Sequence, residues 1–193
     1  SGKTEYLEEL KKAVDLNEEM IDKATSFIQK HYKNFSSMSW VYSCGAGANY
    51  GTALESALKM GETIHIPSCC YEIEEYIHGP NLQLTPQYNV IFFDGNDGAS
   101  HRVEQVYKAT RKVSNRAYLI SNNPQLLGDD HVLRLSDTVS SELCPLVYLP
   151  FVQLLSFIIS NDLHSIYQHP LLKEFKAIAA AKTENFVNYD GDD

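Results

Sequence analysis

The 193-residue sequence has few cysteines and few basic side chains. Its four cysteines contain no C-x-x-C pair, which argues against both a disulfide framework and a zinc site. Sixteen basic side chains against twenty-five acidic ones give a net charge of −9, so no basic stripe is available to bind nucleic acid. We therefore expect a reducing, cytoplasmic setting and no nucleic-acid partner.

The sequence also lacks a secretory signal and a clear membrane span. Its longest apolar run, residues 144–160, is shorter than the about 20 residues that a spanning helix needs, and it contains Pro145 and Pro150. We expect a buried helix at 146–160 and no membrane association. Because the first residues are Ser-Gly rather than methionine, we expect the natural polypeptide to be longer.

The first thirty residues have apolar side chains at helical spacing. This pattern predicts an amphipathic helix of about seven turns, with Lys and Glu on its other face. The apolar positions are Leu7, Leu10, Val14, Ile21, Ala24 and Ile28.

The rest of the chain alternates between short apolar runs and helical patterns. The alternation predicts an α/β fold: one three-layer α/β/α domain spanning 1–193, with a mostly parallel sheet of about five strands flanked by helices. The expected strands are 38–47, 63–66, 89–94, 116–121 and 131–136, and the expected helical segments are 50–62, 71–77, 100–113, 146–160 and 170–183.

A glycine loop follows the first expected strand. Gly45, Gly47 and Gly51 lead into a helix, which is where open α/β sheets bind ligands. Their G-x-G-x-x-x-G spacing differs from the dinucleotide fingerprint, so a nucleotide is not indicated. The residues leave two interpretations equally open, a tight strand-to-helix turn or contact with a ligand.

The following helix places three charged residues on one face. Glu55, Lys59 and Glu62 stand at i, i+4 and i+7. The spacing favours a surface ion-pair ladder worth a few tenths of a kcal/mol per pair. The alternative is that Lys59 holds one carboxylate ionised as a catalytic base.

A histidine in a His-Gly-Pro turn, His78, is the third candidate. Such a residue is usually only exposed, but a neutral imidazole can transfer protons near neutral pH, as opening a sugar hemiacetal requires. The other histidines have no metal-ligand spacing. We expect neither a metal nor a cofactor.

Residues 44–80, CGAGANYGTALESALKMGETIHIPSCCYEIEEYIHGP, carry a family resemblance. They resemble the second (C-terminal) sugar-isomerase (SIS) domain of glucosamine-6-phosphate synthase and of the fructosamine- and glucoselysine-6-phosphate deglycases. The family pattern is G-x-G-x-x-Y-x-x-A-L-E-x-A-L-K-x-x-E followed by H-G-P, and this chain matches it at fixed spacing. The resemblance implies an SIS fold and a sugar phosphate or phosphorylated sugar-amine as substrate.

The resemblance also implies roles for individual residues. Glu62 would be the base that moves a proton between C1 and C2 of the opened sugar. His78 would open the ring, reaching the site of the neighbouring subunit in a homodimer, and Lys182 would close over the sugar. The residues that would bind substrate are Gly45, Gly47, Asn49, Tyr50, Glu55 and Lys59.

Three departures from the family pattern matter. Gly61 stands where a lysine is expected and Ala46 where an arginine is common. The acidic run at Glu72, Glu74 and Glu75 is closer to deglycases and could meet an ammonium group, although a solvated turn is the simpler interpretation. The S-x-S-G-x-T phosphate loop is missing, and DGNDGAS (94–100) would repel phosphate. We therefore expect an upstream SIS domain in a longer two-domain protein.

These observations predict the base-carrying SIS domain of a sugar-phosphate aldose–ketose isomerase or deglycase, which acts by proton transfer between C1 and C2. Two alternatives remain. One is a non-catalytic module that senses sugar phosphates, and the other is a dimerisation half whose activity resides elsewhere. Glu62 and His78 together argue against both, and the helix-turn-helix expected of a regulator is not visible in the sequence.

Overall fold

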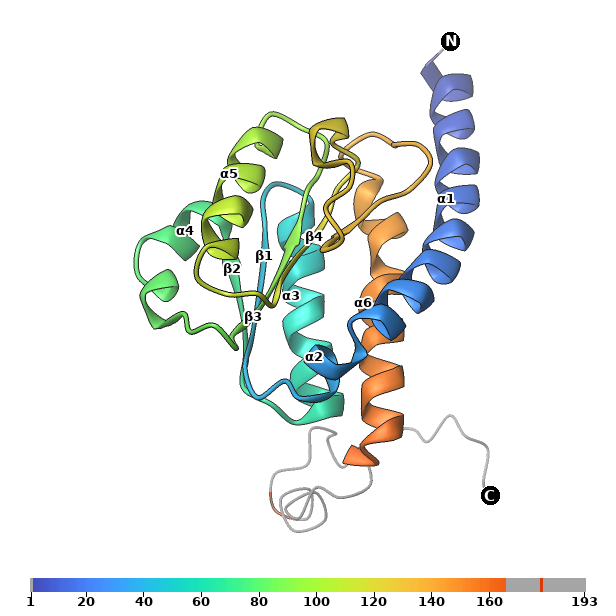
Figure 1. Cartoon of the computed structure of the whole chain (residues 1–193). Helices are drawn as coiled ribbons and strands as arrows, with labels where there is room; N and C mark the ends of the chain where they lie inside the picture. The colour runs from blue at the N-terminus through green and yellow to red at the C-terminus, as the bar shows by residue number, and fades with distance from the viewer. Residues whose placement is uncertain (1, 166–177, 179–193) are drawn as a thin grey trace, which may run out of the picture.

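The structure, a computed structural model, describes residues 2–165 and Ile178. Within this part of the chain a five-stranded sheet lies between two layers of helices (Figure 1), which confirms the predicted three-layer class. The helix expected at 170–183 and the candidate Lys182 lie outside the described residues. The elements are α1 Gly2–Lys30, α2 Tyr32–Ser36, β1 Val41–Gly45, α3 Asn49–Lys59, the π-helix η1 Met60–Ile64, β2 Ser68–Glu72, α4 Ile73–Ile77, the 3-10 helix η2 Pro80–Gln83, β3 Asn89–Phe93, α5 Ser100–Arg111, β4 Ala117–Ile120, the 3-10 helix η3 Pro124–Leu126, β5 Val132–Leu133 and α6 Cys144–Asp162.

All neighbouring strands run parallel, in the order β2-β1-β3-β4-β5. Every residue of β1, β3 and β4 is buried, as expected when helices cover both faces of a sheet. The carboxyl ends of β1 and β3 lie side by side, with Gly45 opposite Phe93. The loops after these two residues therefore sit at the edge where parallel sheets bind their ligands.

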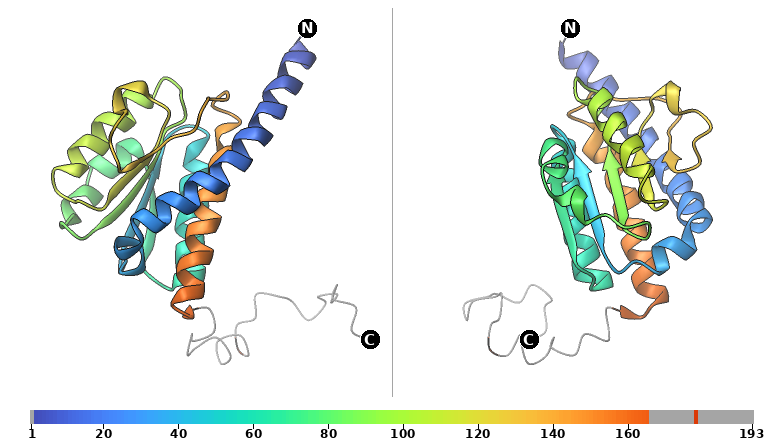
Figure 2. Two further views of the ribbon diagram at one scale, coloured as in Figure 1. Left: turned by 45° about the vertical axis from the view of Figure 1, so that its right-hand side comes forward. Right: turned by 60° about the vertical axis from the view of Figure 1, so that its left-hand side comes forward.

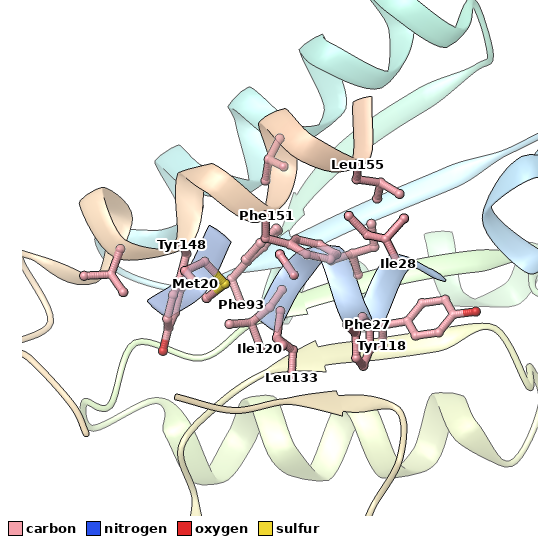
Figure 3. Close-up of a cluster of buried hydrophobic side chains, with 14 of the residues drawn as sticks. Met20, Phe27, Ile28, Phe93, Tyr118, Ile120, Leu133, Tyr148, Phe151 and Leu155 are labelled. Carbon is pink, nitrogen blue, oxygen red and sulfur yellow. The ribbon is translucent and has the colours of Figure 1, made fainter. Parts of the chain in front are cut away.

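The helices α1, α3 and α6 cover one face of the sheet (Figures 1 and 2). Phe27 packs edge-on against Tyr118 and Phe151, with ring centroids 5.8 and 6.2 Å apart. The helix expected at 146–160 is α6. Other members of this core, shown in Figure 3, include Met20, Ile28, Phe93, Ile120, Leu133 and Leu155.

The helices α4 and α5 cover the other face of the sheet. Their core is rich in tyrosine, and the hydroxyls of Tyr42, Tyr76 and Tyr107 are hydrogen-bonded. The Tyr76 hydroxyl lies 3.0 Å from the Thr110 hydroxyl, and the Tyr107 hydroxyl donates to Asp129 at 2.8 Å. The two layers therefore enclose two separate cores on either side of one sheet.

The structure corrects the expected apolar face of α1. Ala24 and Ile28 are buried, but Leu7, Val14 and Ile21 are 57%, 60% and 42% exposed. A neighbouring stripe of the helix packs on the core instead, formed by Ala13, Leu16, Met20, Ala24 and Phe27. The helix therefore has two apolar stripes, one buried and one exposed, and the prediction took residues of both as a single face.

The prediction of a strand at 63–66 was wrong. The chain continues from α3 into the π-helix η1 and turns at His65, which has a left-handed φ of 61°. The strand next to β1 starts only at Ser68. The apolar Ile64 is buried on the α1/α3/α6 side rather than in the sheet.

Candidate functional site

The glycine loop after β1 owes its composition to backbone geometry. A Cβ at Gly45 would lie 2.4 Å from the carbonyl oxygen of Asn49, so only glycine lets the strand end approach α3 this closely. Gly47 has φ of 54°, a conformation that glycine adopts without strain. By contrast, a Cβ at Gly51 would meet nothing within 4 Å. The tight turn alone thus accounts for the first two glycines.

Asn49 and Tyr50 begin the helix after this loop. The Asn49 side chain is fully buried, and its Oδ1 accepts a hydrogen bond from Thr52 at 2.9 Å. Its Nδ2 is buried with no hydrogen-bond partner among the described residues. Tyr50 is half-buried beside Cys70, whose proximity raises the pKa of the phenol. Of the two, only Tyr50 has side-chain surface open to a ligand.

The loop after β3 is poorly suited to hold a phosphate, because side chains of the loop itself occupy three of its N–H groups. The buried Asp94 accepts hydrogen bonds from the Asn96 amide at 3.1 Å and from the hydroxyls of Ser100 and Ser121 at 2.5 Å each. The amides of Asp97 and Ala99 donate to Ser100 and Asp97 respectively, at 2.9 and 2.8 Å. Asp94 is therefore an internal anchor of the loop.

The predicted ladder on α3 is present. Lys59 Nζ lies 2.9 Å from Glu62 Oε2 and 3.6 Å from Glu55 Oε1, with Lys59 between the two carboxylates. The hydrogen bond with Glu62 is the largest cause that raises the pKa of Lys59. The Glu62 side chain remains 50% exposed, so it can reach both the lysine and a bound molecule.

Glu62 stands in the π-helix that ends α3. Such widened turns are rare and occur frequently at functional sites. Gly61 permits the close packing of this turn, because a Cβ there would lie 3.1 Å from Ser68 Oγ. The segment just after α6 also anchors the turn, since the Ser165 hydroxyl donates to the Thr63 carbonyl at 2.6 Å. Glu62 is thus an exposed carboxylate on a firmly held backbone.

His78 ends α4 with an exposed side chain. Its Nδ1 lies 2.6 Å from the carbonyl oxygen of Glu74. Because a carbonyl can only accept, Nδ1 carries the proton in the neutral ring, and Nε2 is left as a proton acceptor. The turn therefore fixes the tautomer that general acid–base chemistry requires.

The acidic residues before His78 stabilise the helix that they belong to, α4. Glu72 and Glu75 form a capping box at the start of α4. Glu74 pairs with Arg102 of α5 through two hydrogen bonds of 2.6 and 3.1 Å. These contacts favour the structural interpretation of the run over binding of a substrate ammonium group.

The candidate acid–base residues lie on opposite faces of the sheet. Glu62 belongs to the turn whose Met60 and Ile64 pack with α1, α3 and α6, whereas His78 ends the helix whose Ile73 and Tyr76 pack with α5. Among the described residues, no hydrogen bond or ion pair joins Glu62 to His78. One chain thus brings together Glu55, Lys59 and Glu62 but keeps His78 apart.

Sequence reasoning did not find the anchoring network of Asp94, Ser100 and Ser121. A signal for it exists, because Asp94 and Ser121 each directly follow a buried apolar strand, and parallel strands end at the same edge. In the described part of the chain, no group of His, Cys, Asp or Glu side chains is arranged to hold a metal ion.

Comparisons with curated proteins identify related sequences, although no family model matches the chain. The chain is 28% identical over 153 residues to a glutamine–fructose-6-phosphate aminotransferase (isomerizing) of Idiomarina loihiensis, covering 78% of this chain and 24% of that protein. It is 26% identical over 156 residues to the enzyme of the same name from Sulfurisphaera tokodaii, covering 80% and 26%. The chain spans about a quarter of the length of the curated relatives it matches.

Solved structures confirm the fold. A presumed phosphosugar isomerase from Clostridium difficile superposes with a TM-score of 0.79 at 22% identity, over 94% of this chain and 52% of that one. The C-terminal domain of glucosamine-fructose-6-phosphate aminotransferase from Francisella tularensis gives 0.71 at 24% identity, over 81% and 44%. The resemblance to the C-terminal SIS domain of these aminotransferases, drawn from residues 44–80, is therefore confirmed, and so is the SIS-type fold.

Proposed function

We propose that this chain is the base-carrying SIS domain of a cytoplasmic aldose–ketose isomerase or deglycase that acts on amino-sugar or fructosamine 6-phosphates. After ring opening, Glu62 removes a proton from one of the carbons C1 and C2 and returns it to the other. His78 transfers the proton that opens the ring. Lys182, which lies outside the described residues, closes over the sugar.

The observation that carries this proposal is the setting of Glu62. Proton transfer next to a carbonyl needs a carboxylate that is accessible, ionised and held in place. Glu62 is half exposed, it pairs with Lys59, and its backbone belongs to a π-turn that is bonded to Ser165, just after α6. Lys182 is seventeen residues beyond Ser165, which bonds next to Glu62, a length of chain that can return to the site.

The position of His78 supports the proposal of a homodimer. Because His78 lies on the other face of the sheet from Glu62, its free Nε2 can act on a sugar only if another chain presents that sugar. Each site of the proposed enzyme therefore combines Glu62 of one subunit with His78 of a neighbour. Glu55 would keep Lys59 in position beside Glu62. Gly47 and Tyr50 lie at the start of α3, about 18 Å along the helix from Glu62, so they would not contact the same sugar.

The loop after β3 offers little to a phosphate group, because Asp94, Asp97 and Ser100 already accept hydrogen bonds from three of its amides. We propose that an upstream SIS domain, which the longer relatives have room for, supplies the phosphate site. This chain would then contribute the base and the ring-opening histidine.

Proton NMR in D₂O tests the function. The protein is incubated with fructose 6-phosphate and with the 6-phosphorylated fructosyl- and glucosyl-lysines, and deuterium is followed at C1 and C2. A Glu62→Gln variant is run alongside a Glu19→Gln control, which breaks a helical ion pair of 2.6 Å with Lys23 on α1.

The proposal expects exchange with the wild type and the control and a loss of at least about 100-fold with Glu62→Gln, as for removal of a general base. The preferred compound would identify the substrate class. Equal exchange in Glu62→Gln would overturn the role of this residue. No exchange by the wild type, with or without a supplied phosphate-binding domain, would favour the sensing module instead.

A further inference from the structure

The helix that carries His78 is too short to be stable by itself. α4 spans Ile73–Ile77, only five residues, whereas isolated helices shorter than about 12–15 residues are marginal in water. Its buried side is attached to the domain by Ile73 in the core and by Tyr76, whose hydroxyl lies 3.0 Å from the Thr110 hydroxyl of α5. The position of His78 therefore depends on how α4 is attached to α5.

Towards the surface, α4 and α5 are separated by a groove of about 680 Å³, with Ile77 and Arg102 among its lining residues. An ion pair joins the two helices beside this groove. Arg102 Nε and Nη2 donate to the two carboxylate oxygens of Glu74 at 2.6 and 3.1 Å. Two such bonds from one guanidinium fix orientation as well as distance. The hydrogen bond from Arg102 also lowers the pKa of Glu74, so the pair stays charged at neutral pH.

Glu74 is also the residue that binds the His78 ring. Its carbonyl oxygen lies 2.6 Å from Nδ1, and its amide donates to Glu72 Oε2 at 2.7 Å. Because a carbonyl can only accept, this contact selects the neutral ring with its proton on Nδ1 and leaves Nε2 as the acceptor. The side chain of Glu74 is thus held by Arg102, and its carbonyl holds the imidazole.

We propose that Arg102 is a positioning residue for His78. By holding Glu74 against α5, it keeps the Glu74 carbonyl where Nδ1 can donate to it, and so keeps Nε2 available for the proton transfer that opens the sugar ring. This inference rests on the proposed function, in which His78 opens the ring. Arg102 acts on His78 only through Glu74 and is therefore not a catalytic residue.

An ion pair at the surface can decide geometry while contributing little to stability. The side chains of Arg102 and Glu74 are 41% and 51% exposed, and pairs of this kind add little to the free energy of unfolding. A displacement of about 1 Å at a catalytic group, however, can lower a rate by about a hundredfold. Replacement of Arg102 should therefore affect the rate much more than the stability.

The ring nitrogens of His78 report its position without any substrate. In the full chain labelled with ¹⁵N-histidine, at a pH where the ring is neutral, the His78 signals are those missing from His78→Ala. The proposal expects a wild-type ring with its proton on Nδ1 and a mixture of both tautomers in Arg102→Gln and in Glu74→Gln. Because the two residues act as one pair, the double variant should differ little from either single one.

A matched control for these spectra is Lys108→Gln. It removes a positive charge and an ion pair with Glu104 from the same helix, but it leaves the contact with α4 intact. This variant should keep the wild-type His78 signals. A His78 tautomer that is unchanged in Arg102→Gln, or a wild-type ring with its proton on Nε2, would overturn the inference.

Deuterium exchange separates the positioning of His78 from a general defect of the site. With a sugar phosphate that must open its ring, Arg102→Gln should lower kcat about tenfold and leave KM within about twofold. The 5-deoxy analogue of the same compound cannot close a ring, so Arg102→Gln should match the wild type on it, while Glu62→Gln stays inactive.

Equal losses of Arg102→Gln with both compounds would contradict a role through His78. A wild type that exchanges with neither compound would refute the proposed function instead. The nitrogen spectra need no substrate, so they decide whether Arg102 positions the His78 ring in either case.

Discussion

The two helical layers of this domain differ on their outer sides. The outer side of α5 carries Gln105, Lys108 and Lys112, which are typical of a helix facing water. The outer side of α6 carries Leu146 and Phe157, and Val14 of α1 lies beside Leu146. Both layers bury apolar inner faces against the same sheet, so folding of one chain does not explain the difference. The outer side of α5 is therefore suited to water, whereas the outer side of the α1/α6 layer is suited to a protein partner.

The candidate chemistry is divided in the same way. The carboxylate Glu62 and its lysine belong to the α1/α3/α6 layer, and the imidazole of His78 belongs to the α4/α5 layer. Among the described residues no hydrogen bond or ion pair joins the two within one chain. The proposed mechanism therefore requires two chains to assemble, so that Glu62 of one and His78 of the other act on the same sugar.

Two phenylalanines of α6 give the largest expected contrast. Phe151 is fully buried and Phe157 is 65% exposed. Phe151→Ala should lower the free energy of unfolding by about 3–5 kcal/mol, because it leaves a cavity between α6 and the sheet. Phe157→Ala, in urea titrations dilute enough to keep the chain monomeric, should change it by less than about 1 kcal/mol. Similar losses for the two would refute the assignment of inner and outer sides.

Removal of the Asp94 carboxylate gives the next largest expected effect. Asp94 lies at the carboxyl edge of the sheet, between the two helical layers. Asp94→Ala leaves an amide and the hydroxyls of Ser100 and Ser121 without their acceptor. We expect a loss of about 2–3 kcal/mol in the free energy of unfolding. Ser121→Ala removes only one donor and should cost less, which urea titration can resolve. An unchanged stability in Asp94→Ala would mean that this carboxylate does not anchor the loop.

Two histidines make the α1 side sensitive to acid. Burial is the main cause that lowers the pKa of His31 and of His131, and the positive charge of Arg111 lowers both further. Below their ordinary pKa the unfolded chain binds protons that the folded chain does not. Stability should therefore fall as pH drops from 7 through about 6.5, by at most about 1.4 kcal/mol per pH unit for each histidine.

The nearby charges do not reverse this direction. Lys30 opposes protonation of His31, and the carboxylate of Asp130, which favours it, acts more weakly than burial. The variant His131→Phe keeps a ring stacked on Tyr118 and should reduce the slope of stability against pH. A slope unchanged in this variant, measured by urea titration at several pH values, would contradict the assignment.

The ion pair between Glu74 and Arg102 gives the smallest expected effect. It joins α4 to α5 on the outside of the layer that faces water, with both side chains about half exposed. Arg102→Gln should cost less than about 1 kcal/mol, and the cost should shrink as salt is added. A loss of several kcal/mol in the free energy of unfolding would show that this surface ion pair, and not the buried core, holds α4 and α5 together.

The sequence was a good guide to the fold and a partial one to its surfaces. The alternating pattern predicted the layers and four of the strands, because buried parallel strands are apolar along their whole length. The prediction of a strand at 63–66 was wrong, because the apolar Ile64 belongs to a π-turn, and no hydrophobic spacing in the sequence predicts such a turn. The sequence pattern also assigned Leu7, Val14 and Ile21 to the same stripe as Ala24 and Ile28. A seven-residue apolar repeat shows that positions share a helix face, but not whether that face packs on the chain's own core.

The candidate site was reached through resemblance more than through physical pattern. Spacing predicted that Glu55, Lys59 and Glu62 share a helix face, and their ion pairs confirm it. Spacing could not reveal that His78 lies across the sheet from Glu62, because that separation depends on which face each helix covers. The roles of Glu62, His78 and Lys182 stay predictions.

A mixing experiment tests most directly whether Glu62 and His78 act together across a subunit boundary. Deuterium exchange at C1 or C2 is measured for Glu62→Gln, for His78→Ala, and for their equal mixture after subunits have exchanged. The account predicts that each variant alone is inactive and that the mixture recovers up to about a quarter of the wild-type rate, because half the dimers then hold one intact site. A mixture no faster than the two variants measured separately, or a wild type that does not exchange deuterium, would contradict the account.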